Sequence, residues 1–334
     1  MISLQKIRGG ELGTPEFQAL YNATVNGIRG GKVTLNGVNP TRILFKDDDA
    51  ATILGTDDGA TKNLGNGKTL IVNPNAAGDN AVTFAATAAT SVSDASPSAD
   101  ISGGTDNKFM ISVDGDEAQE VELTVAALTT GVAIAAAMEA AIQALGGNKT
   151  GVTVAFDSVY TITSGTLGTG SSVVITDAAE ANVADDLKLG AVNEGVETAG
   201  TGDFVDAAAA TPAEVAAAIN KKATGWTATA EGNKIRITSP TAGKDSSLVV
   251  NAGSTADEIL GITGSAYGAQ GLGYDTDMVD ANYLALATLN GVASASLAGK
   301  CLSVTNRATT GFQVECETAD ATHNVDVLIL GAAA

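Results

Sequence analysis

The chain has 334 residues, enough for two to four domains, and a formal net charge of −20 with a pI near 4.2. This charge repels nucleic-acid phosphates and anionic membrane surfaces, so we expect neither nucleic acid nor membrane as a partner. Aromatic residues make up 4% of the chain and much of its 44% hydrophobic content is Ala. Burial then stabilises the fold less per residue than in a Leu- and Phe-rich enzyme, and contacts between subunits are expected to add stability. An Ala- and Gly-rich monomer fits the same composition.

The first 46 residues differ in charge from the rest of the chain. They carry six basic residues against Glu11 and Glu16, a net of +4, which leaves −24 for residues 47–334. Such a segment suits docking on an acidic neighbour, including another copy of the chain, although an ordinary solvated terminus looks the same. The sequence predicts a short helix over 16–26 and strands over 32–35 and 42–45. We expect no secretory signal, because the N-terminus lacks an apolar stretch, and no membrane span.

Two hairpins are predicted in the first half of the chain. Segments 108–113 and 120–124 flank an Asp114-Gly115 turn, and Asp-Gly between alternating strands is a strong hairpin signal. Segments 68–72 and 80–84 flank a turn rich in Pro, Asn and Gly and have the same shape. A linker-like stretch rich in Ser and Asp follows the earlier hairpin.

An internal repeat is the strongest signal in the sequence. Residues 151–176 and 225–251 align throughout with a one-residue gap. The alignment pairs Tyr160–Ser164 with Ile235–Ser239, Gly168 with Gly243, Ser171-Ser172 with Ser246-Ser247, and Val173–Ile175 with Leu248–Val250.

An Ala-rich helix is predicted before each copy of the repeat. Before the second copy, Thr211 is a suitable N-cap, Pro212 suits the first helical position, and Glu214 completes a capping box. Before the first copy, a stripe at helical spacing predicts a core-facing side that ends at Gly146-Gly147. The stripe consists of Ile134, Met138, Ile142 and Leu145. A short motif follows each copy, at Asp186–Gly190 and Glu258–Gly261.

The order of these elements predicts a nested arrangement. The second helix lacks a hairpin directly before it, whereas the hairpin at 68–84 lacks a helix after it. We therefore expect a module A made of residues 56–98 plus 200–271, with a module B, residues 99–199, inserted into it. Two modules in series, with the second truncated, are the alternative.

The C-terminal region reads as strands at 283–289, 300–305, 312–317 and 324–330. With the N-terminal strands, these predict a terminal attachment unit made of residues 1–55 and 272–334. The predicted fold class is α+β, mostly β, with two small hairpin–helix–β modules and a β-rich unit from the two terminal segments.

The two cysteines lie in one predicted hairpin. Pairing Leu302 with Val314 and Val304 with Phe312 gathers the apolar side chains on one face. That register places Cys316 on the apolar face and Cys301 on the other, so we expect two free thiols and synthesis in a reducing compartment.

The inventory of reactive side chains is small. The chain has one histidine, His323, in a polar turn, and His and Cys together are too few for a zinc site. Residues 65–69 resemble the end of a P-loop, but Lys62 stands where that pattern needs glycine and a strand follows instead of a helix. We expect no catalytic, cofactor-binding or metal-binding residues and no enzymatic activity.

Acidic runs are the remaining candidates for a metal site. The runs at 47–49, 57–58 and 275–280 could hold Ca²⁺ through carboxylate oxygens, but none has EF-hand spacing, and solvated turns are the preferred interpretation. Paired carboxylates could also cleave polysaccharide, but sugar enzymes usually present many aromatic residues and this chain has one Trp.

The order hairpin, Ala-rich helix, strand pair and D-L-x-L-G motif over residues 56–268 resembles repeats in tailed-phage virion proteins, including sheath-like and fibre-like chains. The run Ala216–Asn220 is also similar to the insertion motif of flagellins and hook-associated proteins. The heptad-like terminal helices of flagellins are absent from this sequence, which favours the phage particle.

The resemblance implies a structural protein of the virion, assembled in the host cytoplasm. A capsid decoration or head-fibre protein with outward modules is expected, and a tail tube, sheath or short-fibre protein or a bacterial adhesin is the alternative. The implied partners are major capsid or tail proteins, other copies of the chain, and possibly host-surface glycan.

Overall fold

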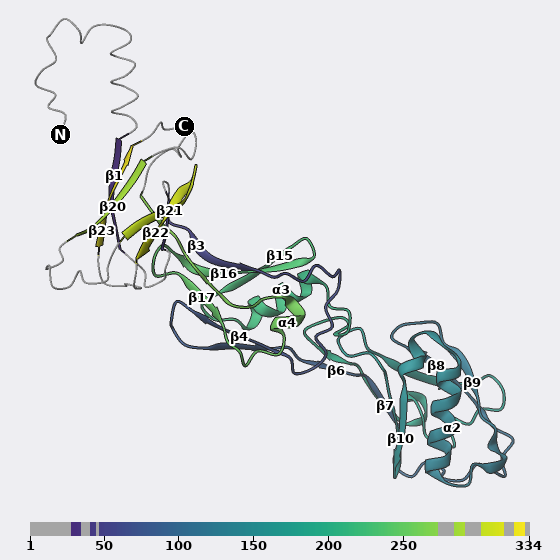
Figure 1. The fold of residues 1–334 in the computed structure, drawn as a ribbon. Helices are drawn as coiled ribbons and strands as arrows, with labels where there is room; N and C mark the ends of the chain where they lie inside the picture. Colours follow the sequence, from purple (N-terminus) through teal and green to yellow (C-terminus); the bar gives the residue numbers. More distant parts are fainter. Residues whose placement is uncertain are drawn as a thin grey trace, which may run out of the picture.

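The computed structural model describes residues 28–34, 41–44, 47–272, 284–290, 302–316 and 324–330. Figure 1 shows the described elements as three groups along one line. The strands from the two ends of the chain lie in the first group, β3, β15, β16 and α3 in the second, and β8, β9, β10 and α2 in the third. The fold is α+β and mostly β, as predicted.

The first group holds two sheets, each of which combines strands from both flanks of the chain. One sheet has the order β1-β23-β20 and the other β19-β2-β22-β21. The strands are β1 (Ile28–Thr34), β2 (Thr41–Leu44), β19 (Gln270–Gly271), β20 (Leu284–Asn290), β21 (Leu302–Ala308), β22 (Gly311–Cys316) and β23 (Asn324–Leu330). The predicted strands therefore exist, with small shifts in their limits. The predicted helix at 16–26 lies outside the described residues.

The register predicted for the hairpin that carries the cysteines is wrong by two residues. Leu302 lies opposite Cys316 and Val304 opposite Val314, instead of Val314 and Phe312. The register shifts between Thr305 and Ala308, next to Asn306, whose φ of 46° lies in the left-handed region. A shift of two keeps each side chain on its face, so Phe312 and Val314 are still buried. Cys301 lies outside the described residues.

The middle group packs two sheets around α3 (Pro212–Lys222), with the short α4 (Asp257–Leu260) beside them (Figure 1). The sheet orders are β18-β17-β4-β5 and β15-β16-β3. The strands are β3 (Ala50–Leu54), β4 (Thr69–Pro74), β5 (Asn80–Thr83), β15 (Thr227–Glu231), β16 (Lys234–Ala242), β17 (Ser247–Val250) and β18 (Ser265–Tyr267).

The outer group repeats this plan around α2 (Gly131–Ala144). Its sheets have the orders β12-β8-β9 and β10-β11-β7-β13. The strands are β7 (Thr90–Val92), β8 (Lys108–Val113), β9 (Gln119–Glu122), β10 (Thr153–Asp157), β11 (Val159–Thr163), β12 (Val173–Asp177) and β13 (Val196–Thr198), with the short helices η2 (Val125–Ala127), η3 (Gly147–Gly151) and η4 (Ala191–Asn193). Below, module A means the middle group, which includes β3, and module B means the outer group, which includes β7.

Each module has a separate hydrophobic core. The buried residues of the core in module A come from two stretches of sequence, 51–86 and 204–262, and those of module B from 89–189. β3, which lies within the predicted terminal segment 1–55, pairs with β16 of module A. β7, which lies within the segment 56–98, pairs with β11 and β13 of module B. The exact division of the chain into three units stays a prediction.

The predicted helix signals are confirmed. The Thr211 side chain accepts a hydrogen bond from the Glu214 N–H, and the Glu214 side chain accepts one from the Thr211 N–H, which completes the capping box. Ile134, Met138 and Ile142 of α2 are fully buried in the core of module B. The helix ends before Gly146 and Gly147, which both have positive φ.

The repeat seen in the sequence appears as a repeated hydrogen-bond network. Asp114 and Asn75 occupy equivalent hairpin turns with φ of 55° and 52°. Asp114 Oδ1 accepts hydrogen bonds from the Ser164 hydroxyl and the Ser172 N–H, at 2.9 and 3.0 Å. Asn75 Oδ1 accepts the same pair from Ser239 and Ser247, both at 2.9 Å. The duplicated sequence therefore folds into the same local structure twice.

A buried serine hydroxyl makes the same contact in each module. Ser246 Oγ accepts a hydrogen bond from the Ala51 N–H at 2.8 Å, and Ser171 Oγ accepts one from the Ala89 N–H, also at 2.8 Å. Both serines are buried, so their hydroxyls satisfy backbone groups that water does not reach.

Replacing either buried serine with alanine leaves an N–H unsatisfied in the protein interior. We expect S171A and S246A each to lower the free energy of unfolding by about 1–3 kcal/mol. S247A is the matched control, because Ser247 bonds to Asn75 through its backbone N–H, which the substitution keeps. Urea unfolding followed by circular dichroism measures the effect. Equal stabilities of S246A and S247A would contradict the assigned role.

Candidate functional site

The structure gives ordinary structural roles to the candidate residues that it describes. Gly65 and Gly67 have positive φ and lead into β4, so residues 65–69 form the predicted turn before a strand. Asp48 Oδ1 accepts a hydrogen bond from the Gly271 N–H at 2.6 Å, and Asp49 pairs with Arg42 at 3.4 Å. His323 and the acidic run at 275–280 lie outside the described residues.

The described residues contain neither a cluster of metal ligands nor a membrane-spanning helix. No group of three or more His, Cys, Asp or Glu side chains there is placed to hold a metal ion. In the same part of the chain, no helix is long and apolar enough to cross a membrane.

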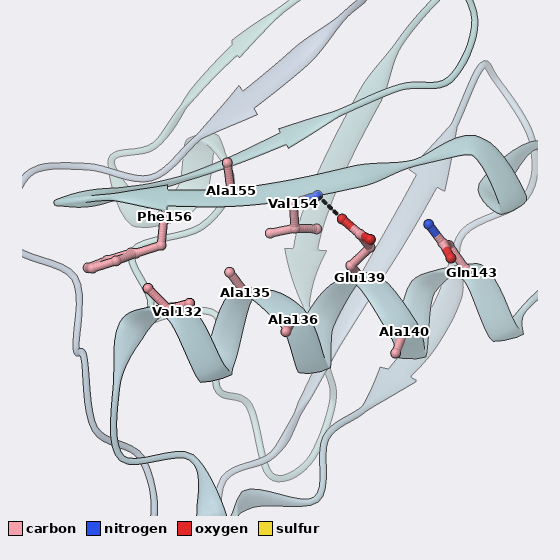
Figure 2. Close-up of a pocket in the computed structure, with 9 residues that line it drawn as sticks. All are labelled: Val132, Ala135, Ala136, Glu139, Ala140, Gln143, Val154, Ala155 and Phe156. Carbon is pink, nitrogen blue, oxygen red and sulfur yellow. Dashed lines mark hydrogen bonds between the residues drawn. The ribbon is translucent and has the colours of Figure 1, made fainter.

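One hollow is a groove between α2 and the edge strand β10 of module B (Figure 2). Its volume is about 420 Å³. The lining residues are Val132, Ala135, Ala136, Glu139, Ala140 and Gln143 from α2 and Val154, Ala155 and Phe156 from β10. Most of these side chains are apolar, so the groove is largely apolar.

Polar side chains of α2 bind the free edge of β10 within this groove. The Val154 N–H donates to Glu139 Oε2 at 2.8 Å, the contact drawn as a dashed line in Figure 2, and Gln143 Nε2 donates to the Val152 carbonyl at 2.8 Å. These backbone groups point away from β11, so the helix replaces the neighbouring strand that an edge strand lacks.

The equivalent position in module A carries Asn220, the last residue of the Ala216–Asn220 run. Asn220 Nδ2 donates to the Ala228 carbonyl at 2.8 Å, and Asn220 Oδ1 accepts from the Ala228 N–H at 2.7 Å. One amide therefore satisfies both backbone groups of an edge residue. This contact gives the motif a structural explanation, which the sequence reasoning did not supply.

The groove has few groups that could carry chemistry. Glu139 is its one titratable residue, and one of its carboxylate oxygens is engaged with β10. The Phe156 ring packs against Gly131, where a Cβ would lie 2.4 Å from the ring, and against Tyr160, with ring centroids 4.8 Å apart. The groove therefore follows the contact between helix and strand and is lined mainly by apolar side chains.

A second hollow of about 500 Å³ lies beside the loop at 98–106. Asp100, Asp106 and Asp186 line it. Asp100 Oδ1 already accepts hydrogen bonds from the Ser102 N–H and hydroxyl, at 2.9 and 2.7 Å. These bonds, with the hydroxyl contributing most, lower the pKa of the Asp100 carboxyl.

Among the described residues, two lysines are almost completely buried, one in each module. Lys62 Nζ contacts the Asp57 carboxylate and donates to the carbonyls of Asp57 and Gly59, at 3.2 and 2.9 Å. Lys149 Nζ contacts the Asp116 carboxylate, and each lysine side chain is only 1% exposed. Each pair fixes a loop, 57–62 in module A and the 114–117 turn in module B. Asp57 is thus part of an ion pair, although its run was interpreted as a solvated turn.

The carboxyl groups of both pairs are more acidic than usual. Burial raises the pKa of Asp116, but hydrogen bonds from Lys149, the Val113 N–H and Ser112 together outweigh it, and the net pKa is lowered. For Asp57, the hydrogen bond from Lys62 is the largest effect and lowers its pKa. Elsewhere in module B, burial raises the pKa of Tyr160 to about 12, and its hydroxyl donates to the Ser98 carbonyl at 2.8 Å.

From the sequence we predicted neither the strands β3 and β7 nor the burial of Lys62 and Lys149. A signal for the strands was present, since Ala50-Ala51-Thr52 and Ala88-Ala89-Thr90 are identical triplets at equivalent positions. The lysines carry no comparable signal, because Lys62 and Lys149 have no counterpart at matching positions of the repeat.

The Asn220 contact can be tested by two substitutions. We expect N220A to lose both hydrogen bonds to Ala228 and to lower the free energy of unfolding by about 1–3 kcal/mol. N220D keeps an acceptor for the Ala228 N–H but sets a second carboxylate oxygen against the Ala228 carbonyl, so at pH 7 its loss should be at least as large. Trp226 lies in the same core and reports unfolding by fluorescence. N220A as stable as the wild type would refute the contact.

The Asp116–Lys149 pair should make stability depend on pH. The folded-state pKa of Asp116 lies below its ordinary value of 3.8, so the unfolded state binds more protons and stability falls as the pH drops below about 4. D116N should be less stable than the wild type at pH 7, and the difference should shrink by pH 3. Urea unfolding at both pH values measures this. An unchanged difference would contradict the pairing.

Solved structures that are similar to this chain include two flagellar cap proteins. One is the flagellar cap protein FliD from Helicobacter pylori, with 12% identity, a TM-score of 0.21, and coverage of 71% of this chain and 85% of that one. The other is the D2-D3 domains of FliD from Serratia marcescens, with 14% identity, a TM-score of 0.24, and coverage of 82% and 98%. No protein-family model and no curated protein matches the sequence. Both structures belong to a bacterial appendage, and TM-scores this low do not establish a shared fold.

Proposed function

We propose that the chain is a non-enzymatic structural component of a phage particle, foremost a capsid decoration or head-fibre protein. In this proposal the two terminal sheets attach to the particle, and modules A and B project outward from it. The alternative is a tail protein, as tube, sheath or short fibre. A bacterial surface or appendage adhesin is a further alternative.

The arrangement of the chain carries this proposal. Both flanks of the chain contribute strands to the terminal sheets, as in the pairs β1–β23 and β2–β22. All remaining described residues leave and return through adjacent strands at the Asp49–Ala269 bridge. Figure 1 shows the two modules extending from there in one direction, with module B farthest from the terminal sheets. This is the geometry expected of an anchored projection.

The charge distribution agrees with an exposed outer module. Residues 89–199 carry three lysines against sixteen Asp and Glu residues, a net of −13. Such a charge keeps neighbouring copies apart and soluble when many of them stand side by side. The basic segment 1–46, at +4, lies on the terminal side, where it would meet an acidic partner surface.

The partners follow from the same proposal. Major capsid or tail proteins would bind the terminal sheets. Contacts between copies in a homo-oligomer would add buried area that cores of small side chains do not provide. A host-surface glycan is a proposed partner of the projecting modules. The proposed location is the virion, after assembly in the host cytoplasm.

Attachment through the terminal sheets predicts the behaviour of a truncated chain. Residues 50–268 are to be replaced by a short Gly-Ser linker, which can join Asp49 and Ala269 because these residues are bridge partners. We expect the truncated chain to cosediment with purified phage particles as the full chain does. Residues 50–268 alone, as the matched control, should stay in the supernatant. Loss of cosedimentation by a truncated chain that keeps its β-sheet circular dichroism would refute the proposal.

Antibody labelling of intact particles decides among the alternatives. Gold label distributed over the head supports a decoration or head-fibre protein, and label on the tail supports the alternative. Label on bacterial surface filaments, with none on particles, would overturn the phage assignment.

A further inference from the structure

The two modules differ at one connection, between the hairpin and the helix. In module B, the Leu123 N–H donates to the Asn107 carbonyl at the end of the hairpin, and the Leu128 carbonyl accepts from the Ile101 N–H at 3.0 Å. Only Thr124–Ala127 separate these anchor residues. Thr130 then caps α2, so the module closes with a four-residue bridge.

Module A has the same two anchors with a long segment between them. The Phe84 N–H donates to the Lys68 carbonyl at 2.8 Å, as Leu123 does to Asn107. The Ala207 carbonyl accepts from the Leu64 N–H at 2.9 Å, as Leu128 does from Ile101. Residues 85–206, which include all of module B, therefore occupy the place of the bridge 124–127.

We call the base of each module, where the chain enters and leaves it, its joint. The backbone hydrogen bonds of the joint are also repeated. At the joint of module A, the Gly243 N–H donates to the Asp49 carbonyl at 3.1 Å. At the joint of module B, the Gly168 N–H donates to the Thr87 carbonyl, also at 3.1 Å. The Gly268 N–H donates to the Ser246 carbonyl at 2.8 Å, and the Gly200 N–H to the Ser171 carbonyl at 3.0 Å.

Close backbone contact explains the glycines of the joints. A Cβ on Gly268 would lie 2.5 Å from the Asp49 carbonyl oxygen, and a Cβ on Gly200 would lie 2.3 Å from that of Gly168. No side chain fits at these distances. Both joints therefore hold their strands by the same tight backbone packing.

The joint between the modules contains further hydrogen bonds and a short strand pair. Thr169 and Gly170 N–H groups donate to the carbonyls of Phe204 and Val205, at 2.8 and 2.9 Å. β6 (Ala86–Thr87) pairs with β14 (Thr201–Gly202), and the two threonine hydroxyls lie 2.9 Å apart. Phe204 itself is buried against Phe84 in the core of module A.

We propose that residues 124–127 are an acceptor site for one further module of the same kind. In both modules the insertion point lies between the hairpin and the helix. Module A contains module B at this point, whereas module B contains only the bridge 124–127. A chain inserted there stands on module B as module B stands on module A. The reach of the array is then set by the number of nested modules, each added with the same step.

Three chain lengths test the proposal. In the short variant, residues 85–206 are replaced by Thr-Val-Ala-Ala, the sequence of the bridge in module B. In the long variant, residues 124–127 are replaced by a second copy of residues 85–206. We expect both variants to unfold cooperatively, and the maximum dimension in small-angle scattering to rise by equal steps from the short variant to the wild type and to the long variant.

Trp226, the one tryptophan of the chain, gives the short variant a separate readout. It is buried in the core of module A, so its fluorescence should keep the wild-type emission maximum. The control for the long variant inserts the same segment between Asp114 and Gly115, where the Asp114 contacts to Ser164 and Ser172 should be lost. That control should not unfold cooperatively.

The proposal requires all of these results. A red-shifted Trp226 in the short variant, an unfolded long variant, unequal steps in length, or a control as stable as the long variant would each overturn it. None of these measurements involves particle binding, so their outcome is independent of the proposed function.

Discussion

The structure depends on satisfying backbone groups where strands and loops meet without water. Short strands, small side chains and many loops leave numerous N–H and carbonyl groups near the two cores, and each unpaired group would cost a large fraction of the stability of a small domain. The chain meets this need with short polar side chains placed at the same positions in both modules. Ser171 and Ser246 bind the N–H groups of Ala89 and Ala51, and Asp114 and Asn75 each bind two groups across a hairpin turn.

The same requirement explains why the Ala-rich helices lie where they do. An edge strand exposes backbone groups that invite pairing with another chain. Asn220 satisfies both groups of Ala228, and Glu139 with Gln143 satisfies two groups of the β10 edge. In module B these contacts lie in the groove of Figure 2, which is lined mainly by apolar side chains of α2 and β10.

The joints turn a repeated module into a projecting array. Each joint consists of adjacent strands, closed by glycines at which no Cβ fits, so the backbones contact each other directly. These joints place the acidic module B far from the terminal sheets (Figure 1). The proposed structural role in a particle would use three features: terminal sheets shared by both flanks of the chain, joints of close backbone contact, and an outer module with a net negative charge.

The sequence by itself determined the elements that depend on local signals. The hairpin turns, the capping box at Thr211, the helix end at Gly146 and the duplication at 151–176 and 225–251 were all predictable, because each depends on neighbouring residues or on direct comparison of two segments. The edge-capping role of Asn220 needed the helix–strand distance, although its motif was visible.

Tertiary structure decided what depends on residues far apart in the chain. β3 and β7 are short strands whose partners lie far away, so weak local patterns could not place them. The burial of Lys62 and Lys149 follows from loop packing that has no periodic signal. The cysteine hairpin lies two residues away from its predicted register, since apolar alternation fixes the face of a strand but not its position along the partner.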